Sequence, residues 1–153
     1  MDTLELSAEL LRVVNFAEEK CRRVSAEESN APILAGGWSR KQVIGHLIDS
    51  ASNNHQRFVR ALLQDSLEFP SYEQNGWSRV QAVEEADWLL LVALWTSYNR
   101  YLAHVIAHLP PAKLDVPIRL GQNEPMTLNA LAEAYLRHLL HHLGQIDAAP
   151  AGN

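Results

Sequence analysis

The stretch from Ser39 to Leu63 reads SRKQVIGHLIDSASNNHQRFVRALL. It opens with the capping-box form Ser39-x-x-Gln42, in which the serine hydroxyl accepts from the backbone N–H of Gln42 while the glutamine side chain reaches back. Apolar residues follow at helical spacing, namely Ile44, Leu47, Ile48, Ala51, Phe58 and Leu62. The stretch therefore predicts an amphipathic helix, the second of the chain, with one face in a core.

Three further segments carry helical spacing of apolar residues: residues 3–24, 78–109 and 127–147. The second of them opens on another capping-box form, Ser78-x-x-Gln81, and ends at a pair of prolines. The third opens on a threonine that caps it and leaves a short loose tail. Together with the quoted stretch they predict four helices.

Four helices of about twenty residues and no convincing strand pattern predict an all-α fold, a four-helix bundle. Only residues 116–120 have an extended pattern. The link between helices two and three, residues 64–77, is longer than the roughly two to eight residues that antiparallel neighbours need. We therefore expect an up-down-down-up topology, in which this link is a long crossover. The whole chain, residues 1–153, is expected to form one domain.

Composition argues against several classes of function. The net charge is -5 and the 13 basic residues are scattered, so no nucleic acid or anionic membrane surface is expected as a partner. The longest apolar run, residues 88–95, is too short to span a bilayer. The single Cys21 cannot form an intramolecular disulfide, and the N-terminus lacks the regions of a signal peptide. We therefore expect a cytoplasmic protein.

The third helix carries apolar surface beyond its core stripe. The residues concerned are Leu89, Leu90, Ala93 and Leu94. Contiguous apolar surface of this kind is typical of interfaces between copies of a chain. The pattern predicts a homodimer.

Three of the seven histidines crowd into residues 135–146, which read YLRHLLHHLGQI. On a wheel of about 100° per residue, His142 falls inside the apolar arc, His138 lies at its edge and His141 points outward. His138 and His142 therefore share a helix face at the spacing that suits two ligands of one metal ion. Such pairs also arise by chance in helices, so a third ligand from elsewhere is needed.

The second helix offers a candidate for that ligand. Beside its apolar arc it carries a polar column, made up of His46, Asp49, Ser50, Asn53 and Arg57. If helices two and four are antiparallel, His46 and His142 lie at similar height. A rival pair, His104 and His108, faces away from the apolar stripe of its own helix. In this topology it would lie at the end of the bundle opposite to His46. The alternative interpretations of the column are a solvated face and a hydrogen-bonded, structural His46.

Four segments of the chain resemble the DinB/YfiT-like superfamily, and the resemblance covers nearly the whole sequence. They are the block from Gly36 to Phe58, residues 72–77, residues 126–128 and the final motif His138-x-x-x-His142-x-Gly144-Gln145-Ile146. The resemblance implies an up-down-down-up bundle in which His46, His138 and His142 bind a divalent metal ion, zinc or nickel. Members of this family are often named metal-dependent hydrolases, and several branches are S-transferases that use bacillithiol or related low-molecular-weight thiols.

The chain departs from the family pattern beside its metal-ligand positions. Gly45 stands where some YfiT-like members carry a histidine, and Leu143-Gly144-Gln145 replaces the usual histidine or arginine environment. The departures leave the three ligands intact and bear on the identity of the substrate.

The expected function is that of a metal-dependent transferase or hydrolase with a small-molecule substrate, such as a low-molecular-weight thiol. Three neutral imidazoles leave positions open on zinc or nickel, and such an ion lowers the pKa of a bound water or thiol. Asp49 is the candidate orienting residue or base, while Asn53 and Arg57 would position an anionic or thiol substrate. Two other classes stay open: a noncatalytic metal or small-ligand binding module, and a dimerising structural bundle without metal.

Overall fold

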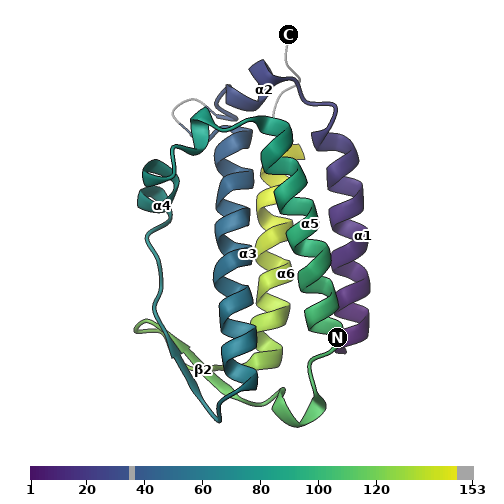
Figure 1. The fold of residues 1–153 in the computed structure, drawn as a ribbon, viewed down its shortest axis with the longest axis vertical. Coiled ribbons are helices and arrows are strands. Elements are labelled where there is room, and N and C mark those ends of the chain that lie inside the picture. Colours follow the sequence, from purple (N-terminus) through teal and green to yellow (C-terminus); the bar gives the residue numbers. More distant parts are fainter. Residues whose placement is uncertain (35–36, 148–153) are drawn as a thin grey trace.

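The structure is a computed structural model that describes residues 1–34 and 37–147 (Figure 1). The expected loose tail lies outside these residues. Four long helices carry the fold, α1 (Thr3–Cys21), α3 (Arg40–Leu62), α5 (Trp88–Ala107) and α6 (Leu128–Asp147). Short helices α2 (Ala26–Asn30) and η2 (Pro111–Lys113) lie in the connections.

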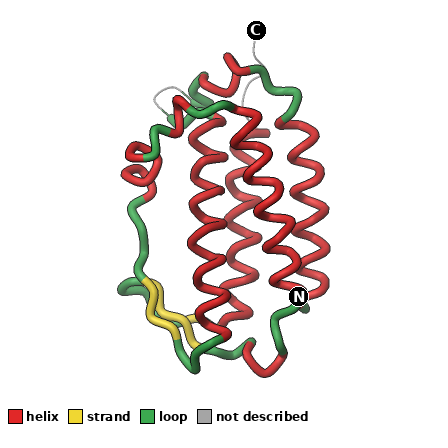
Figure 2. Tube along the Cα trace, in the orientation of Figure 1, coloured by secondary structure: helices red, strands yellow, loops and turns green. Residues whose placement is uncertain are grey.

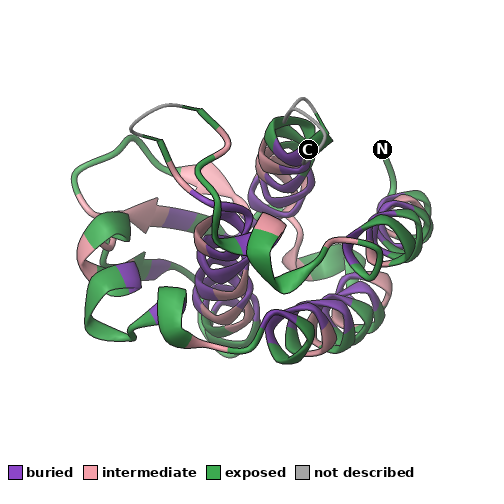
Figure 3. Ribbon diagram, turned by 90° about the horizontal axis from the view of Figure 1, so that it is seen from above, coloured by how far each residue is buried: buried purple, intermediate pink, exposed green. Residues whose placement is uncertain are grey.

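The long helices form a bundle with the predicted topology. The chain rises through α1, descends through both α3 and α5, and rises again through α6 (Figure 1). Helices α1 and α3 each pack against both α5 and α6, so α1 and α3 lie on one diagonal of the bundle. Seen from above, the buried sides of the helices face the middle (Figure 3). The expected up-down-down-up bundle is confirmed.

Side-chain caps set where two of these helices begin. Ser39 Oγ accepts from the backbone N–H of Gln42 at 3.2 Å, and the Gln42 side chain accepts from the Ser39 backbone N–H at 2.9 Å. At the start of α6, Thr127 Oγ1 accepts from the backbone N–H of Ala130 at 3.1 Å. Both predicted starts are confirmed. These caps set where the first turns of α3 and α6 begin.

The predicted start of the third helix at Ser78 is wrong. Ser78 lies buried inside a separate short helix, α4 (Gln74–Val80). The chain then passes through Ala82, whose φ of 51° is left-handed, and the turn η1 (Val83–Glu85). Helix α5 begins only after Asp87, whose side chain accepts from a backbone N–H of its first turn.

The crossover between α3 and α5 contains a strand that the sequence analysis did not predict. Strand β1 (Leu67–Phe69) pairs in parallel with β2 (Pro117–Leu120), and β2 pairs antiparallel with β3 (Met126–Thr127). These strands lie at the end of the bundle where α3 ends (Figure 2). The expected absence of strands is corrected, whereas the extended segment at 116–120 is confirmed as β2. Leu67 and Ile118 pair in register and are both buried, which ties the sheet to the core.

The core contains two tryptophans of α5 and the cysteine at the end of α1. Trp88 and Trp95 are 3% and 0% exposed, and Cys21 is 2% exposed. Burial raises the pKa of the Cys21 thiol to about 11, so it is a neutral apolar side chain at pH 7. Tyr135 donates to Asn99 across the core between α6 and α5.

The outer face of α5 exposes apolar side chains. Leu89, Leu90 and Leu94 are 49%, 63% and 48% exposed. The homodimer expected from them stays a prediction. No helix in the described part of the chain is long and apolar enough to cross a membrane.

Candidate metal centre

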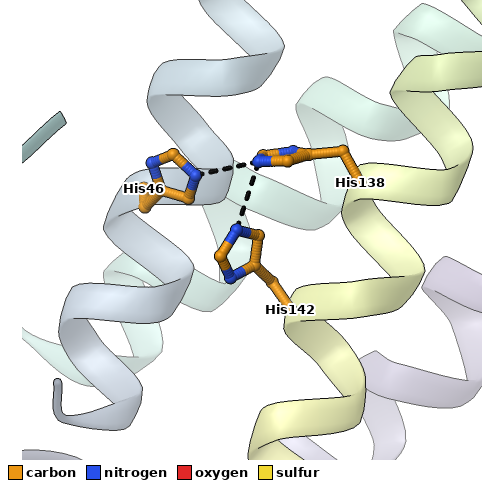
Figure 4. Close-up of side chains that lie close together, drawn as sticks. All are labelled: His46, His138 and His142. Carbon is orange, nitrogen blue, oxygen red and sulfur yellow. Dashed lines mark hydrogen bonds between the residues drawn. The ribbon is translucent and has the colours of Figure 1, made fainter. Parts of the chain in front are cut away.

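Three histidine side chains meet between α3 and α6 (Figure 4). His46 comes from the second turn of α3, and His138 and His142 come from consecutive turns of α6. The Nε2 atom of His138 lies 3.0 Å from Nε2 of His46 and 3.1 Å from Nε2 of His142. The candidate ligand atoms of the three residues all lie within 4.8 Å of one another. The structure therefore brings together the three residues predicted as metal ligands.

The remaining histidines on α5 and α6 are not part of this cluster. His141 is exposed, as the helical wheel predicts, and so are His104 and His108. Among residues 1–34 and 37–147, the trio forms the only group of three or more histidine, cysteine or acidic residues spaced to hold an ion. The rival pair on α5 therefore has no third ligand.

Hydrogen bonds at the outer ring nitrogens orient two of the histidines. His142 Nδ1 lies 2.9 Å from Oε1 of Gln145, and His138 Nδ1 lies 3.4 Å from Oγ of Ser50. An amide oxygen only accepts, so His142 carries its proton on Nδ1 and turns the lone pair of Nε2 toward the cluster. A converging set of imidazole nitrogens fits a divalent ion of the zinc or nickel type.

Burial keeps these rings neutral. It lowers the pKa of His46 to about 3 and that of His138 to about 4, and in both cases the neighbouring imidazoles lower it further. The pKa of His142 is also lowered, chiefly by burial. Metal ions bind the neutral form of imidazole. All three rings are therefore in the binding form at pH 7.

Two aromatic rings form walls beside the histidines. The Trp38 ring lies 5.3 Å from the ring of His46 and 6.2 Å from that of His142, nearly parallel to the latter. The Tyr72 ring lies 6.5 Å from that of His46. Both residues fall in segments that resemble the family, yet no role was predicted for them. They come from connections, which have no helical period to show which way a side chain faces.

The residues predicted as catalytic are buried along α3 rather than solvated. Asp49, Asn53 and Arg57 are 3%, 8% and 7% exposed, so the interpretation of the column as a solvated face is wrong. The crossover covers them: Gln81 donates to Asp49 Oδ1 at 2.9 Å, and the Arg57 guanidinium lies 5.5 Å from the ring centre of Phe69. Asn53 donates to the backbone oxygen of Asp49 at 2.9 Å.

Burial raises the pKa of Asp49, and its hydrogen bond from Gln81 opposes that rise. Within the described part of the chain, no hydrogen bond joins Asp49, Asn53 or Arg57 to the histidine cluster. Their roles stay predictions.

Gly45, the residue before His46, lies in close contact with Val83 of the crossover. A Cβ atom at this position would lie 2.6 Å from Cγ1 of Val83 in η1. The glycine therefore lets the crossover pack directly on α3. A larger side chain at this position would require Val83 or the backbone of α3 to move.

The model of the DinB superfamily matches residues 6–146. A "Putative metal-dependent hydrolase" of Bacillus mycoides is 25% identical over 144 residues, which are 94% of this chain and 79% of that protein. The Bacillus subtilis protein "Putative metal-dependent hydrolase YfiT" is 27% identical over 129 residues, covering 76% of this chain and 66% of that protein. The names of both relatives refer to metal-dependent chemistry.

A solved structure supports the same fold. The structure of YfiT from Bacillus subtilis superimposes with a TM-score of 0.82 over 94% of this chain and 83% of that one, at 24% identity. It is described as "a probable metal-dependent hydrolase with an unusual four-helix bundle topology". The match of the family model extends over most of the chain, from α1 to the last turn of α6. This chain therefore belongs to the DinB superfamily.

Proposed function

We propose that this chain is a metal-dependent hydrolase whose ion is held by His46, His138 and His142. The observation that carries the proposal is the convergence of three neutral imidazoles on one point between α3 and α6. The names of the relatives add support. When bound, zinc or nickel lowers the pKa of a coordinated water or thiol, which makes a nucleophile available near neutral pH.

Asp49 positions His46 in this proposal. Nδ1 of His46 and Oδ2 of Asp49 are both buried, and neither has a hydrogen-bond partner among the described residues. The two residues are three positions apart on α3, where helix side chains are neighbours. One bridging water, or a small shift of the carboxylate, satisfies both atoms. The carboxylate then holds the proton of His46 on Nδ1 and turns Nε2 toward the ion.

The metal site is tested by elemental analysis of untagged protein loaded with zinc or nickel. We expect about one ion per chain in the parent, and a loss of most of it in His46→Ala and in His142→Ala, because each removes one of three ligands. His104→Ala is the matched control, since it removes an exposed histidine of an H-x-x-x-H pair. Equal metal in the parent and in His46→Ala would refute the tri-histidine site.

The reaction is tested with metal-loaded protein on model esters and amides, and separately on a low-molecular-weight thiol with an electrophile. We expect hydrolysis that stops when a chelator removes the ion and returns when zinc or nickel is restored. Turnover only in the presence of the thiol would replace the hydrolase with a transferase. If neither reaction occurs while the metal is bound, the chain is a noncatalytic binding module.

A further inference from the structure

A pocket of about 830 Å³ lies between α3, the crossover and α5. Residues from all three parts line it, among them Asn53, Arg60, Phe69, Tyr72, Trp77 and Tyr98. Its volume is in the range of pockets that bind small molecules, about 300–1,000 Å³. The histidines do not line it, but Tyr72 does, and the ring of Tyr72 lies 6.5 Å from that of His46. The pocket therefore borders the candidate metal centre.

Aromatic rings dominate the walls of this pocket. The rings of Tyr72 and Trp77 lie 5.0 Å apart at an angle of 52°, and Phe69 continues the same wall. Tyr98 of α5 also lines the pocket, and its hydroxyl is hydrogen-bonded to Nδ1 of His55 at 2.8 Å, which fixes that ring. Rings in such positions bind a planar apolar group by stacking and edge contacts.

The pocket lining contains one basic residue, Arg60, and one acidic residue, Glu73. Arg60 lines it, and Nε of Arg60 donates to Gln56, while no carboxylate in the described part of the chain forms an ion pair with it. Arg57 lies behind Phe69 and is 7% exposed, and its Nε has no hydrogen-bond partner among the described residues. A buried cation without a counter-charge favours an anion nearby.

The acidic residue of the lining is already engaged. Glu73 accepts hydrogen bonds from the backbone N–H groups of Asn75 and Gly76 at the start of α4. Its carboxylate therefore serves as the cap of that helix. The pocket is left with aromatic walls and with Arg60, which has no ion-pair partner among the described residues, while the Glu73 carboxylate is turned to the backbone of α4.

We propose that this pocket binds an aromatic carboxylate. The ring lies between Tyr72, Trp77 and Tyr98, and the carboxylate lies toward Arg60. Because Tyr72 borders both sites, a group attached to the ring reaches the histidines. That this ligand is the substrate rests on the proposed function, whereas its binding does not.

The proposal is tested by calorimetric titration of metal-loaded protein with two probes of the same shape, 2-naphthoate and the neutral 2-naphthalenemethanol. We expect the carboxylate to bind about tenfold more tightly, because an arginine–carboxylate contact is charge-assisted. Arg60→Gln should weaken binding of 2-naphthoate about three- to tenfold and leave binding of the alcohol unchanged. Trp77→Ala should weaken binding of both probes.

Arg23→Gln is the matched control, because it removes an arginine that lies in the turn just after α1, is 74% exposed and pairs with Glu19. Equal affinities for the two probes, or unchanged affinities in folded Arg60→Gln and Trp77→Ala, would overturn the proposal. His46→Ala distinguishes the pocket proposal from the proposed function, because it removes a proposed metal ligand and leaves the lining of the pocket intact. If 2-naphthoate binds but the parent hydrolyses nothing, only the hydrolase is refuted. If the parent hydrolyses simple esters but does not bind 2-naphthoate, only the pocket proposal is refuted.

Discussion

At the scale of single residues, the candidate site depends on what lies behind each ring nitrogen. Gln145 and Ser50 meet the outer nitrogens of His142 and His138, while the outer nitrogen of His46 is buried and has no hydrogen-bond partner among the described residues. Such outer partners fix the tautomer of a ligand and its orientation. In the proposed metal site, the three histidines would therefore be sensitive to residues that do not touch the ion.

Asp49→Asn tests this dependence. The amide keeps the shape of the side chain and removes the charge that would hold the His46 proton on Nδ1. We expect zinc affinity to fall about tenfold or more, measured by competition with a chromophoric chelator. Asp115→Asn, on the exposed surface, is the control. Unchanged affinity in Asp49→Asn would show that Asp49 does not position His46.

Gly45→Ala tests the contact between η1 and α3. The added Cβ would lie 2.6 Å from Val83, so one of the two must move. We expect the free energy of unfolding to fall by about 1–3 kcal/mol in denaturant titration. Gly144→Ala is the matched control, because no atom lies within 4 Å of its added Cβ. It should gain about 0.5–1 kcal/mol from better helix propensity. A Gly45→Ala protein as stable as the parent would argue against tight packing at this contact.

At the scale of elements, the crossover does more than connect α3 to α5. Its strand β1 joins the sheet, Gln81 bonds to Asp49, and Val83 packs on Gly45. In this way it covers the polar column of α3 and forms one wall of the aromatic pocket. A segment that sequence patterns describe only as a link thus completes both candidate sites.

The turn at Ala82 is the strained point of this crossover. A φ of 51° costs an L-residue about 1–2 kcal/mol, and Ala82 is exposed. Ala82→Gly should therefore raise the free energy of unfolding by about 0.5–1 kcal/mol, after the entropy cost of glycine in the unfolded chain. Ala8→Gly, at an exposed site within α1, should instead lower it by about 1 kcal/mol. Equal losses in both variants would contradict a left-handed Ala82.

At the scale of the whole molecule, the neutral histidines make stability depend on pH. In metal-free protein their pKa values lie below the ordinary 6.5, so between about pH 4 and 6.5 the unfolded chain binds protons that the folded chain does not. Stability is therefore present above pH 6.5 and is lost as pH falls through this window. Thermal unfolding with a chelator should show a clear loss of stability from pH 7 to pH 5.

His46→Leu is the comparison for this effect, because it removes the ring with the most strongly lowered pKa. Its stability should fall less between pH 7 and pH 5 than that of the parent. The same pH dependence in both proteins would mean that other groups cause it. Saturating zinc should raise the stability of the parent at pH 7, because the ion binds only the folded site.

The sequence by itself determined the four long helices, except for the start of α5, and the facing of the histidines. Apolar residues at a period of 3.6 set which side of a helix is buried, and this local signal placed His138 and His142 inward and His141 outward. The length of the link after α3 indicated the parallel descent of α3 and α5, and that topology placed His46 at the height of His142. The predicted trio follows from these features together with the family resemblance.

Only the tertiary structure decided what surrounds the trio. Ser78-x-x-Gln81 has the same local form as the cap of α3, but Gln81 donates to Asp49, which is 32 positions away. The strands and the walls formed by Trp38 and Tyr72 likewise depend on contacts between segments far apart in the chain. Loops have no period, so their side-chain directions are fixed only when the chain closes around α3.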